Sequence, residues 1–359
     1  MKKIDKTILI SVIIISLFGL LMIYSSSSIW AEYKFNDPYK FLKTKGIFLL
    51  IGYILIYIIS KIPYQTYYKY SNIILLICII LLILVLIPGI GTVRNGSRSW
   101  FGNGSFRIQP SEFTKLGIII FTSKYLTNNK IKNIKTSVLP ILCVVLLTFG
   151  LIMLQPDFGT GLIIVVTIIA LLFVSGVKLN FFLILGIIGL IGIAGLIIIA
   201  PYRLKRIISF LNPWADPLGS GFQIIQSLYA IGPSGLLGAG LGNSVQKHFY
   251  LPEPQTDFIF SIISEELGFI GVLFVSTLFI TIIYHGIKIS LKQENHFAKY
   301  LSFGLTFSLA IQTILNLMVV VGLIPVTGVT LPFLSYGGSS LLVSMTNIGI
   351  LLNISKNNH

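Results

Sequence analysis

Long runs of apolar residues, separated by shorter polar segments, dominate this chain of 359 residues. A helix that crosses a lipid bilayer needs about 20 mostly apolar residues. The first run follows several lysines, but no small-residue cleavage site comes after it, so we interpret it as a membrane helix and not as a signal peptide. The pattern predicts ten membrane-spanning helices, at residues 8–24, 46–60, 72–88, 113–126, 138–154, 159–174, 181–200, 259–284, 300–321 and 336–354.

The composition agrees with this pattern, because 55% of the residues are hydrophobic and only 10% are charged. A soluble domain carries roughly 25% charged residues. These values exclude a soluble enzyme, a disordered protein and a disulfide scaffold. We therefore expect an all-α polytopic membrane protein. It forms a single membrane domain over residues 1–359, with ten transmembrane helices and a long extracytoplasmic loop between the seventh and the eighth.

The formal net charge of +15 is a value that nucleic-acid-binding proteins also reach. In a membrane protein the simpler explanation is that basic loops set the topology and contact anionic membrane lipids, so no nucleic-acid partner is expected. Basic residues are denser in the loops that lie inside when the N terminus is inside. This density favours cytoplasmic N and C termini, although Lys40, Lys43 and Lys45 then fall in an outer loop.

Chemically diverse side chains gather on the predicted outer face. All five arginines and nine of the eleven acidic residues lie outside or at outer helix ends in this topology. No acid lies in the middle of a predicted span, which argues against a proton- or sodium-coupled carrier. The chain also lacks a Walker-type phosphate loop, which argues against an ATP-driven pump. Chemistry on the outer face is the interpretation that remains.

Two predicted outer loops, 88–112 and 201–258, are long enough to carry function. In the second loop, residues 203–211 place cations beside apolar residues, and this pattern predicts an amphipathic helix at the membrane surface. A glycine-rich run at 232–242 follows. Such a run permits turns and close packing, or it can cradle a phosphate. The sequence leaves both interpretations open.

Among the acidic residues, Asp257 is the strongest candidate for a catalytic role. It lies in the stretch Leu251-Pro-Glu-Pro-Gln-Thr-Asp-Phe-Ile-Phe260, where the chain enters the predicted eighth span. Partial desolvation at that depth makes a carboxylate a better proton acceptor. The alternative is that Asp257 or Thr256 only caps the helix. Position alone does not decide between a catalytic and a capping role.

Two further outer carboxylates have ordinary explanations when each is taken alone. Asp157 lies in Gln155-Pro-Asp-Phe-Gly-Thr160, where Pro-Asp and Gly indicate a tight turn. Glu112 and Lys115 are three residues apart at the start of the fourth span and can form a salt bridge. The convergence of three carboxylates, a lysine and several arginines on one membrane face favours a site for an anionic, membrane-embedded substrate, such as a lipid-linked phosphate.

The motifs around these residues resemble those of the SEDS family, which comprises the FtsW, RodA and SpoVE proteins. The wording of residues 242–247 and 326–332 is closer to the FtsW and SpoVE branches than to RodA. The matching segments follow the family order over most of the chain: 95–100, 108–115, 155–160, 240–247, 251–260, 264–268 and 325–340.

The resemblance implies an inverting peptidoglycan glycosyltransferase, a multi-pass protein of the bacterial plasma membrane. It would polymerise lipid II on the outer face, for cell division or for the sporulation septum. The implied partners are lipid II, a class B penicillin-binding protein that acts as transpeptidase, other divisome proteins and membrane lipids. The family's proposed catalytic aspartate matches Asp257, and its functionally sensitive positions match Glu112, Lys115 and Asp157.

A mechanism follows as a hypothesis. Asp257 is the general base on the acceptor hydroxyl, and undecaprenyl pyrophosphate is the leaving group. Arg98, Lys115 and Lys247 are weaker candidates for holding the pyrophosphate. A divalent cation such as Mg or Mn could help to neutralise it, although the sequence assigns no metal ligands. Two alternatives stay open: a lipid II flippase, and a non-enzymatic divisome scaffold for a penicillin-binding protein.

Overall fold

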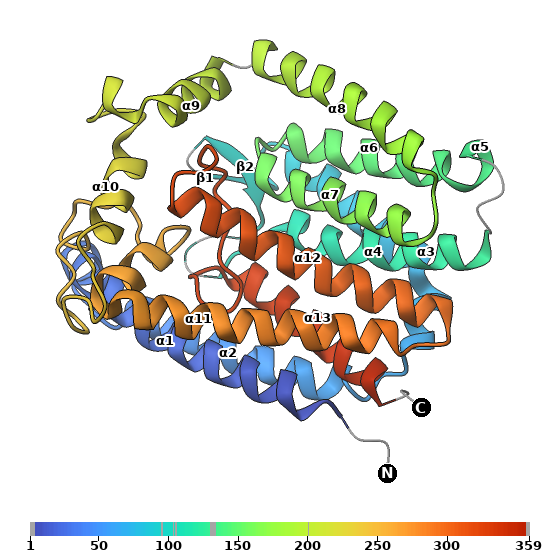
Figure 1. Ribbon diagram of the computed structural model, residues 1–359, viewed down its shortest axis with the longest axis horizontal. Coiled ribbons are helices and arrows are strands. Elements are labelled where there is room, and N and C mark those ends of the chain that lie inside the picture. The colour runs from blue at the N-terminus through green and yellow to red at the C-terminus, as the bar shows by residue number, and fades with distance from the viewer. Residues whose placement is uncertain are drawn as a thin grey trace.

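A bundle of long helices forms the body of the protein, with both termini near one end (Figure 1). This computed structural model describes residues 4–94, 96–102, 104, 106–129, 134–199 and 201–356. Its elements are α1 (Lys6–Phe35), α2 (Lys40–Ile59), α3 (Tyr64–Leu86), β1 (Thr92–Arg94), β2 (Ser97–Trp100), α4 (Pro110–Asn128), α5 (Ile134–Ser137), α6 (Leu139–Met153), α7 (Phe158–Val174), α8 (Leu179–Ile199), α9 (Pro201–Leu211), the 3-10 helix η1 (Pro213–Ala215), α10 (Phe222–Ile231), α11 (Ile259–Leu291), α12 (His296–Val320) and α13 (Gly338–Ser355).

Each of the ten predicted spans overlaps one helix, in chain order α1–α4, α6–α8 and α11–α13. Within the described residues, six helices are long and apolar enough to cross a membrane on that basis alone, namely α1, α2, α3, α11, α12 and α13. Helices α6 and α7 are apolar but shorter, and α4 contains three charged residues. The architecture is that of a polytopic helical membrane protein, as predicted.

Two predicted boundaries near the N terminus are wrong. Helix α1 continues to Phe35, well past the predicted end at residue 24, and α2 begins at Lys40 instead of residue 46. The three lysines assigned to an outer loop therefore belong to α2. Lys45 is only 2% exposed, and its ammonium donates a hydrogen bond to the carbonyl of Leu334. A contact between segments so far apart in sequence leaves no trace in local hydropathy.

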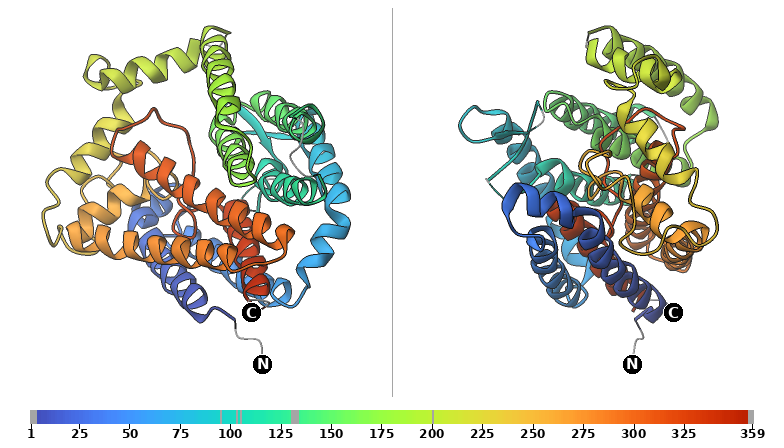
Figure 2. Two further views of the ribbon diagram at one scale, coloured as in Figure 1. Left: turned by 45° about the vertical axis from the view of Figure 1, so that its right-hand side comes forward. Right: turned by 90° about the vertical axis from the view of Figure 1, so that its left-hand side faces the viewer.

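Helices α12 and α13 lie near the middle of the bundle (Figure 2). Helix α13 packs against α2, α4 and α12, and α12 packs against α4, α7 and α11. Because lipid tails are as apolar as the helices, helices associate in a membrane through close packing at small residues. At Gly304 a Cβ would lie 2.7 Å from Ile119, and at Gly349 it would lie 2.9 Å from Ile59. These glycines let neighbouring helices approach closely.

The predicted outer loop 88–112 contains a β-hairpin that ends before α4. Strands β1 and β2 pair antiparallel, with Arg94 opposite Ser97. Helix α4 begins at Pro110, and proline suits the first helical position because its missing N–H would be unpaired there anyway. The hairpin lies at the end of the bundle away from the termini (Figure 1).

The predicted outer loop 201–258 contains two α-helices, α9 and α10, and the 3-10 helix η1. Helix α9 confirms the helix expected over residues 203–211, although the side chains of Arg203 and Arg206 lie outside the described part of the chain. Helix α10 packs against α11 and α12. The hydroxyl of Ser227 on α10 lies 2.7 Å from that of Ser261 and donates to the carbonyl of Val320 at 2.6 Å. These contacts tie the loop to the membrane helices.

Helix α11 is interrupted at Gly268, where φ is 62° and ψ is −156°. Such a break leaves backbone groups on either side without their helical partners. The glycine-rich run supplies new partners, because the N–H groups of Ala239 and Gly240 donate to the carbonyls of Glu265 and Glu266, both at 2.9 Å. The broken helix and the loop thus complete each other's hydrogen bonds.

The glycines of this run serve close backbone packing. A Cβ on Gly238 would lie 2.5 Å from the carbonyl group of Glu266, and one on Gly268 would lie 2.4 Å from the backbone nitrogen of Gly238. On the other side of the break, the N–H of Phe269 donates to the carbonyl of Gly235 at 3.0 Å. Of the two interpretations that the sequence left open, these contacts support packing over phosphate binding.

Candidate active site

A polar cleft lies among the hairpin, the start of α4 and the segments that precede α7, α11 and α13. One compartment has a volume of about 220 Å³, and a second compartment of about 400 Å³ shares part of its wall. Of the six predicted site residues, Glu112, Asp157 and Asp257 line the cleft. The residues common to both compartments are Arg94, Trp100, Gln109, Asp157, Glu253, Asp257 and Gly328.

Asp257 lies just before α11, which begins at Ile259. The N-cap residue of α11 is Phe258, so neither Asp257 nor Thr256 occupies the capping position. The hydroxyl of Thr256 lies 2.8 Å from Oδ1 of the Asp257 carboxylate. The side-chain amide of Asn316 on α12 donates to the backbone carbonyl of Asp257 at 2.7 Å and to that of Val329 at 2.8 Å. One side chain therefore fixes two walls of the cleft.

Asp157 occupies the N-cap position of α7, where its Oδ1 accepts from the N–H of Thr160 at 3.2 Å. Its Oδ2 accepts from the side-chain amide of Gln109 and from the hydroxyl of Ser111, both at 2.8 Å. The turn expected from the sequence is present. In addition, the carboxylate joins the start of α4 to the start of α7 and lines the cleft between them.

Glu112 and Lys115 form the salt bridge that their spacing allows, with 2.9 Å between Nζ and Oε2. Both side chains are less than a tenth exposed, and Lys115 also donates to Oε1 of Gln312 at 2.7 Å. The amide nitrogen of Gln312 donates to the carbonyl of Thr330 and to the hydroxyl of Ser340, both at 3.0 Å. Lys115 therefore lies behind the cleft wall and holds it through Gln312.

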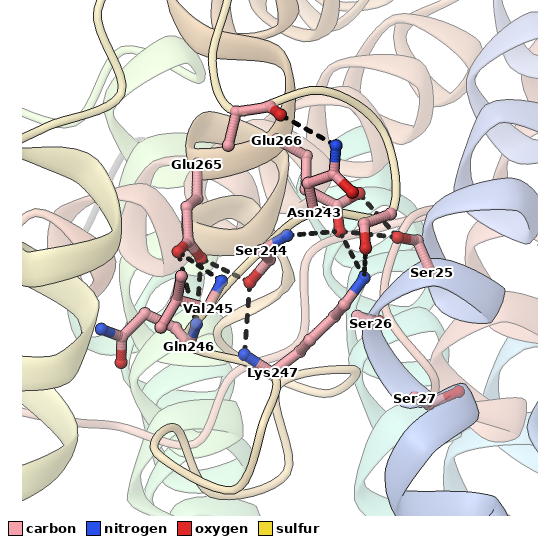
Figure 3. Close-up of polar contacts among 12 residues, drawn as sticks. Ser25, Ser26, Ser27, Asn243, Ser244, Val245, Gln246, Lys247, Glu265 and Glu266 are labelled. Atoms are coloured by element: carbon pink, nitrogen blue, oxygen red, sulfur yellow. Dashed lines mark hydrogen bonds and ion pairs between the residues drawn. The ribbon is translucent and has the colours of Figure 1, made fainter.

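Arg98 and Lys247, the two other predicted cations, lie outside the lining of both compartments. The guanidinium of Arg98 donates to the carbonyl of Leu86 at the end of α3, at 3.3 Å. The ammonium of Lys247 lies 3.0 Å from Oε1 of Glu266, in the cluster that Figure 3 draws between α1, α11 and the preceding loop. Ser25 on α1 donates to the same carboxylate.

The structure adds two charged residues that the sequence analysis did not single out for the site. Arg94 on β1 pairs with Glu253, its Nη2 atom lying 2.9 Å from both carboxylate oxygens. The two residues are 159 positions apart, so no local spacing signals the pair. The Pro-Glu-Pro sequence around Glu253 was the one available clue to a rigid, positioned carboxylate.

The described residues of the cleft do not present a set of metal ligands. Among the described residues, no three His, Cys, Asp or Glu side chains are grouped closely enough to hold a metal ion. The carboxylates that line the cleft are instead engaged by hydrogen-bond donors, as at Asp157, or by cations, as at Glu112. These carboxylates therefore already have partners within the chain.

The fold and the cleft together define the class of protein. It is a multi-pass helical membrane protein with a charged cleft formed by helix ends and by the segments that connect the helices. A family model for the cell cycle proteins FtsW, RodA and SpoVE matches residues 5–359. The chain belongs to this family, and the resemblance expected from the motifs is confirmed.

Similar proteins cover nearly the whole chain. Stage V sporulation protein E of Bacillus subtilis (strain 168) is 51% identical, over 98% of this chain and 97% of its own length. The probable peptidoglycan glycosyltransferase FtsW of Trichlorobacter lovleyi is 42% identical, over 98% of this chain and 93% of its own length. A solved chain from a peptidoglycan synthase complex gives a TM-score of 0.81 at 29% identity, covering 99% of each chain. The solved structure of the rod shape determining protein RodA of Thermus thermophilus gives a TM-score of 0.74 at 26% identity, covering 99% of this chain and 98% of the RodA chain.

Proposed function

We propose that the chain is a peptidoglycan glycosyltransferase that polymerises lipid II on the outer face of a bacterial plasma membrane. The observation that carries the proposal is the carboxylate of Asp257 in a polar cleft beside the start of a membrane helix. This position suits a base that acts on a substrate whose lipid remains in the bilayer. The family and its relatives named as glycosyltransferases support the reaction class.

In the proposed mechanism, Asp257 accepts the proton of the acceptor sugar hydroxyl. The resulting nucleophilic oxygen forms a bond to the anomeric carbon of the donor. The bond from that carbon to the pyrophosphate oxygen breaks, and undecaprenyl pyrophosphate leaves with the electron pair. Attack opposite the leaving group inverts the carbon and gives a β-linkage. General base catalysis of this kind contributes typically about 100-fold to 10,000-fold in rate.

The other predicted site residues have supporting roles in this proposal. Asp157 fixes the starts of α4 and α7, and the pair of Glu112 and Lys115 holds the cleft wall through Gln312. That Arg98, Lys115 and Lys247 hold the pyrophosphate stays a prediction. Their cations lie against the carbonyl of Leu86, against Glu112 and against Glu266.

The proposed partners are a class B penicillin-binding protein that crosslinks the product, other divisome proteins and membrane lipids. The similar chain from a peptidoglycan synthase complex, in which polymerization and crosslinking are coordinated, supports a transpeptidase partner. The proposed orientation places both termini in the cytoplasm, and the setting is division or sporulation.

The test is reconstitution of the purified chain with lipid II and the partner penicillin-binding protein. We expect glycan strands from the wild type. The rate of strand synthesis by Asp257→Asn should be reduced by about 100-fold or more. The matched control is Asp216→Asn, which makes the same change in the loop before α11 but outside the lining of the cleft, and it should retain the wild-type rate.

Other outcomes of this assay are equally informative. Strand synthesis by Asp257→Asn at the wild-type rate would show that Asp257 is not the base. Transfer of lipid II between leaflets without strand synthesis would indicate a flippase. Neither activity, with the partner still bound, would indicate a scaffold.

A further inference from the structure

The cleft has an unusual balance of charge for a site that receives a pyrophosphate. Among the described residues that line its two compartments, Glu112, Asp157, Glu253 and Asp257 are acidic, and Arg94 carries the only positive charge. A pyrophosphate group is itself anionic, so it needs a positive partner to enter a cleft of this kind. Arg94 is the side chain placed to supply it.

The guanidinium of Arg94 is held but not saturated by its carboxylate partner. Both contacts with Glu253 come from a single terminal nitrogen, Nη2, whereas a guanidinium has five N–H donors in a fixed fork. The side chains of Arg94 and Glu253 are 38% and 34% exposed, so solvent and solutes reach the pair. An end-on contact of this type leaves donors for a second anion.

Two other cations near the cleft, Lys115 and Lys247, are engaged by buried partners. The ammonium of Lys115 lies between Glu112 and Gln312 and is 5% exposed. That of Lys247 lies against Glu266 and the carbonyl of Gly242, with the side chain 4% exposed. Removing either from its buried carboxylate would leave an uncompensated charge. Arg94, by contrast, is accessible and already faces the cleft.

We propose that Arg94 binds the pyrophosphate of the lipid-linked donor and that Glu253 is the positioning residue that aims its guanidinium into the cleft. This inference rests on the proposed function, because it assigns the anion that the leaving group carries. Arginine suits the role, since its planar fork can bind two phosphate oxygens at once, whereas a lysine acts as a point charge.

The backbone around Glu253 fits a positioning role. Glu253 has φ of 43°, a left-handed conformation that a residue with a Cβ adopts only at a cost. The carbonyl of Glu253 accepts from the N–H of Thr256 at 3.1 Å, and the hydroxyl of Thr256 lies within reach of both that carbonyl and the Asp257 carboxylate. The short turn therefore places the partner of Arg94 and the proposed base in one rigid unit.

The test measures binding separately from catalysis. The full chain in nanodiscs is titrated with undecaprenyl pyrophosphate and with undecaprenyl monophosphate, for the wild type, Arg94→Gln, Arg94→Lys and Glu253→Gln. We expect Arg94→Gln to bind the pyrophosphate about 10-fold to 100-fold more weakly, the range for losing a hydrogen bond to a charged group. It should also lose the preference for pyrophosphate over monophosphate. Arg94→Lys should bind the pyrophosphate more tightly than Arg94→Gln but more weakly than the wild type. The affinity of Glu253→Gln should also lie between those of the wild type and Arg94→Gln.

The matched control is Lys43→Gln, which removes one positive charge from the exposed pair between Lys43 and Asp37, outside the cleft. It should bind both lipids as the wild type does. Unchanged selectivity in Arg94→Gln, or an equal loss in Lys43→Gln, would overturn the proposal. Strand synthesis is assayed in parallel. A wild type that polymerises lipid II beside an Arg94→Gln variant with unchanged KM would refute this inference and leave the proposed function intact, whereas an inactive wild type would refute the proposed function itself.

Discussion

A buried ion pair holds the loop before α11 to the membrane helices. The side chains of Lys247 and Glu266 are 4% and 0% exposed, and Ser25 adds a hydrogen bond from α1. Desolvating two such charges is costly, and their attraction offsets the cost only while both partners are present. The pair therefore contributes little when intact but makes the loss of one member severe.

We expect Lys247→Met to lower the free energy of unfolding by about 3–5 kcal/mol, because it leaves the Glu266 carboxylate buried without its cation. The double variant Lys247→Met/Glu266→Gln should recover part of that loss. Thermal unfolding in detergent measures both changes. The control Lys43→Met breaks an exposed pair and should cost at most about 1 kcal/mol. An equal loss in the single and the double variant would contradict this account.

Asp157 combines a helix cap with a side-chain contact, and two substitutions separate these roles. Asp157→Ala should cost about 1–2 kcal/mol of stability, because the N–H of Thr160 loses its acceptor. Asp157→Asn keeps an amide oxygen for that N–H and should cost less. Thermal unfolding compares the two variants. If both lost the same stability, the cap would not be the source of the effect.

At the residue scale, the sequence predicted the carboxylates of the cleft better than its cation. Asp257, Asp157 and Glu112 lie in short motifs whose chemistry is local, and all three line the cleft. Arg94 and Glu253 meet only because the hairpin and the loop before α11 fold together. No spacing rule links two residues 159 positions apart.

Among the elements, α11 departs most from what its sequence suggests. Hydropathy predicts one uninterrupted span from residue 259, but the chain is broken at Gly268 and repaired by hydrogen bonds from residues 235–240. A single backbone conformation does not alter the apolar pattern, so periodicity could not reveal the break. The amphipathic segment at 203–211 was predictable because its cations and apolar residues alternate at helical spacing.

We expect Gly268→Ala to destabilise the protein by at least about 1–3 kcal/mol. The φ and ψ of Gly268 lie in a region that only glycine adopts readily, and a Cβ there would lie 2.4 Å from the backbone nitrogen of Gly238. The control is Gly46→Ala in α2, where a Cβ would contact nothing within 4 Å. That variant should be as stable as the wild type or more so. Folding yield and thermal unfolding compare them, and wild-type stability in Gly268→Ala would be incompatible with the break.

On the scale of the whole molecule, the hairpin that lines part of the cleft lies at the end of the bundle away from both termini (Figure 1). The places and order of the long helices were predictable, since each of the ten predicted spans overlaps one helix. Their packing was not, because α12 also contacts α4 and α7, and α13 also contacts α2 and α4, which are distant in sequence. Hydropathy specifies that a segment is in lipid, and small residues such as Gly304 then decide which neighbour it contacts.

The proposed orientation predicts which loops a membrane-impermeant thiol reagent reaches in intact cells. In a variant without Cys78 and Cys143, Leu218→Cys lies in the long loop before α11 at a position 87% exposed, and it should react from outside. Lys292→Cys, between α11 and α12, should react only after the membrane is permeabilised. The reverse pattern would place the cleft in the cytoplasm.

The two hydrogen bonds of Asn316 link the cleft to the bilayer. Because one amide on α12 holds the carbonyls of both Asp257 and Val329, the separation of those two walls depends on the position of a membrane helix. Membrane helices tilt to match the thickness of the surrounding hydrocarbon. We expect a change in the tilt of α12 to displace both of these walls relative to the rest of the cleft, and we therefore expect the reaction rate to vary with the thickness of the lipid bilayer.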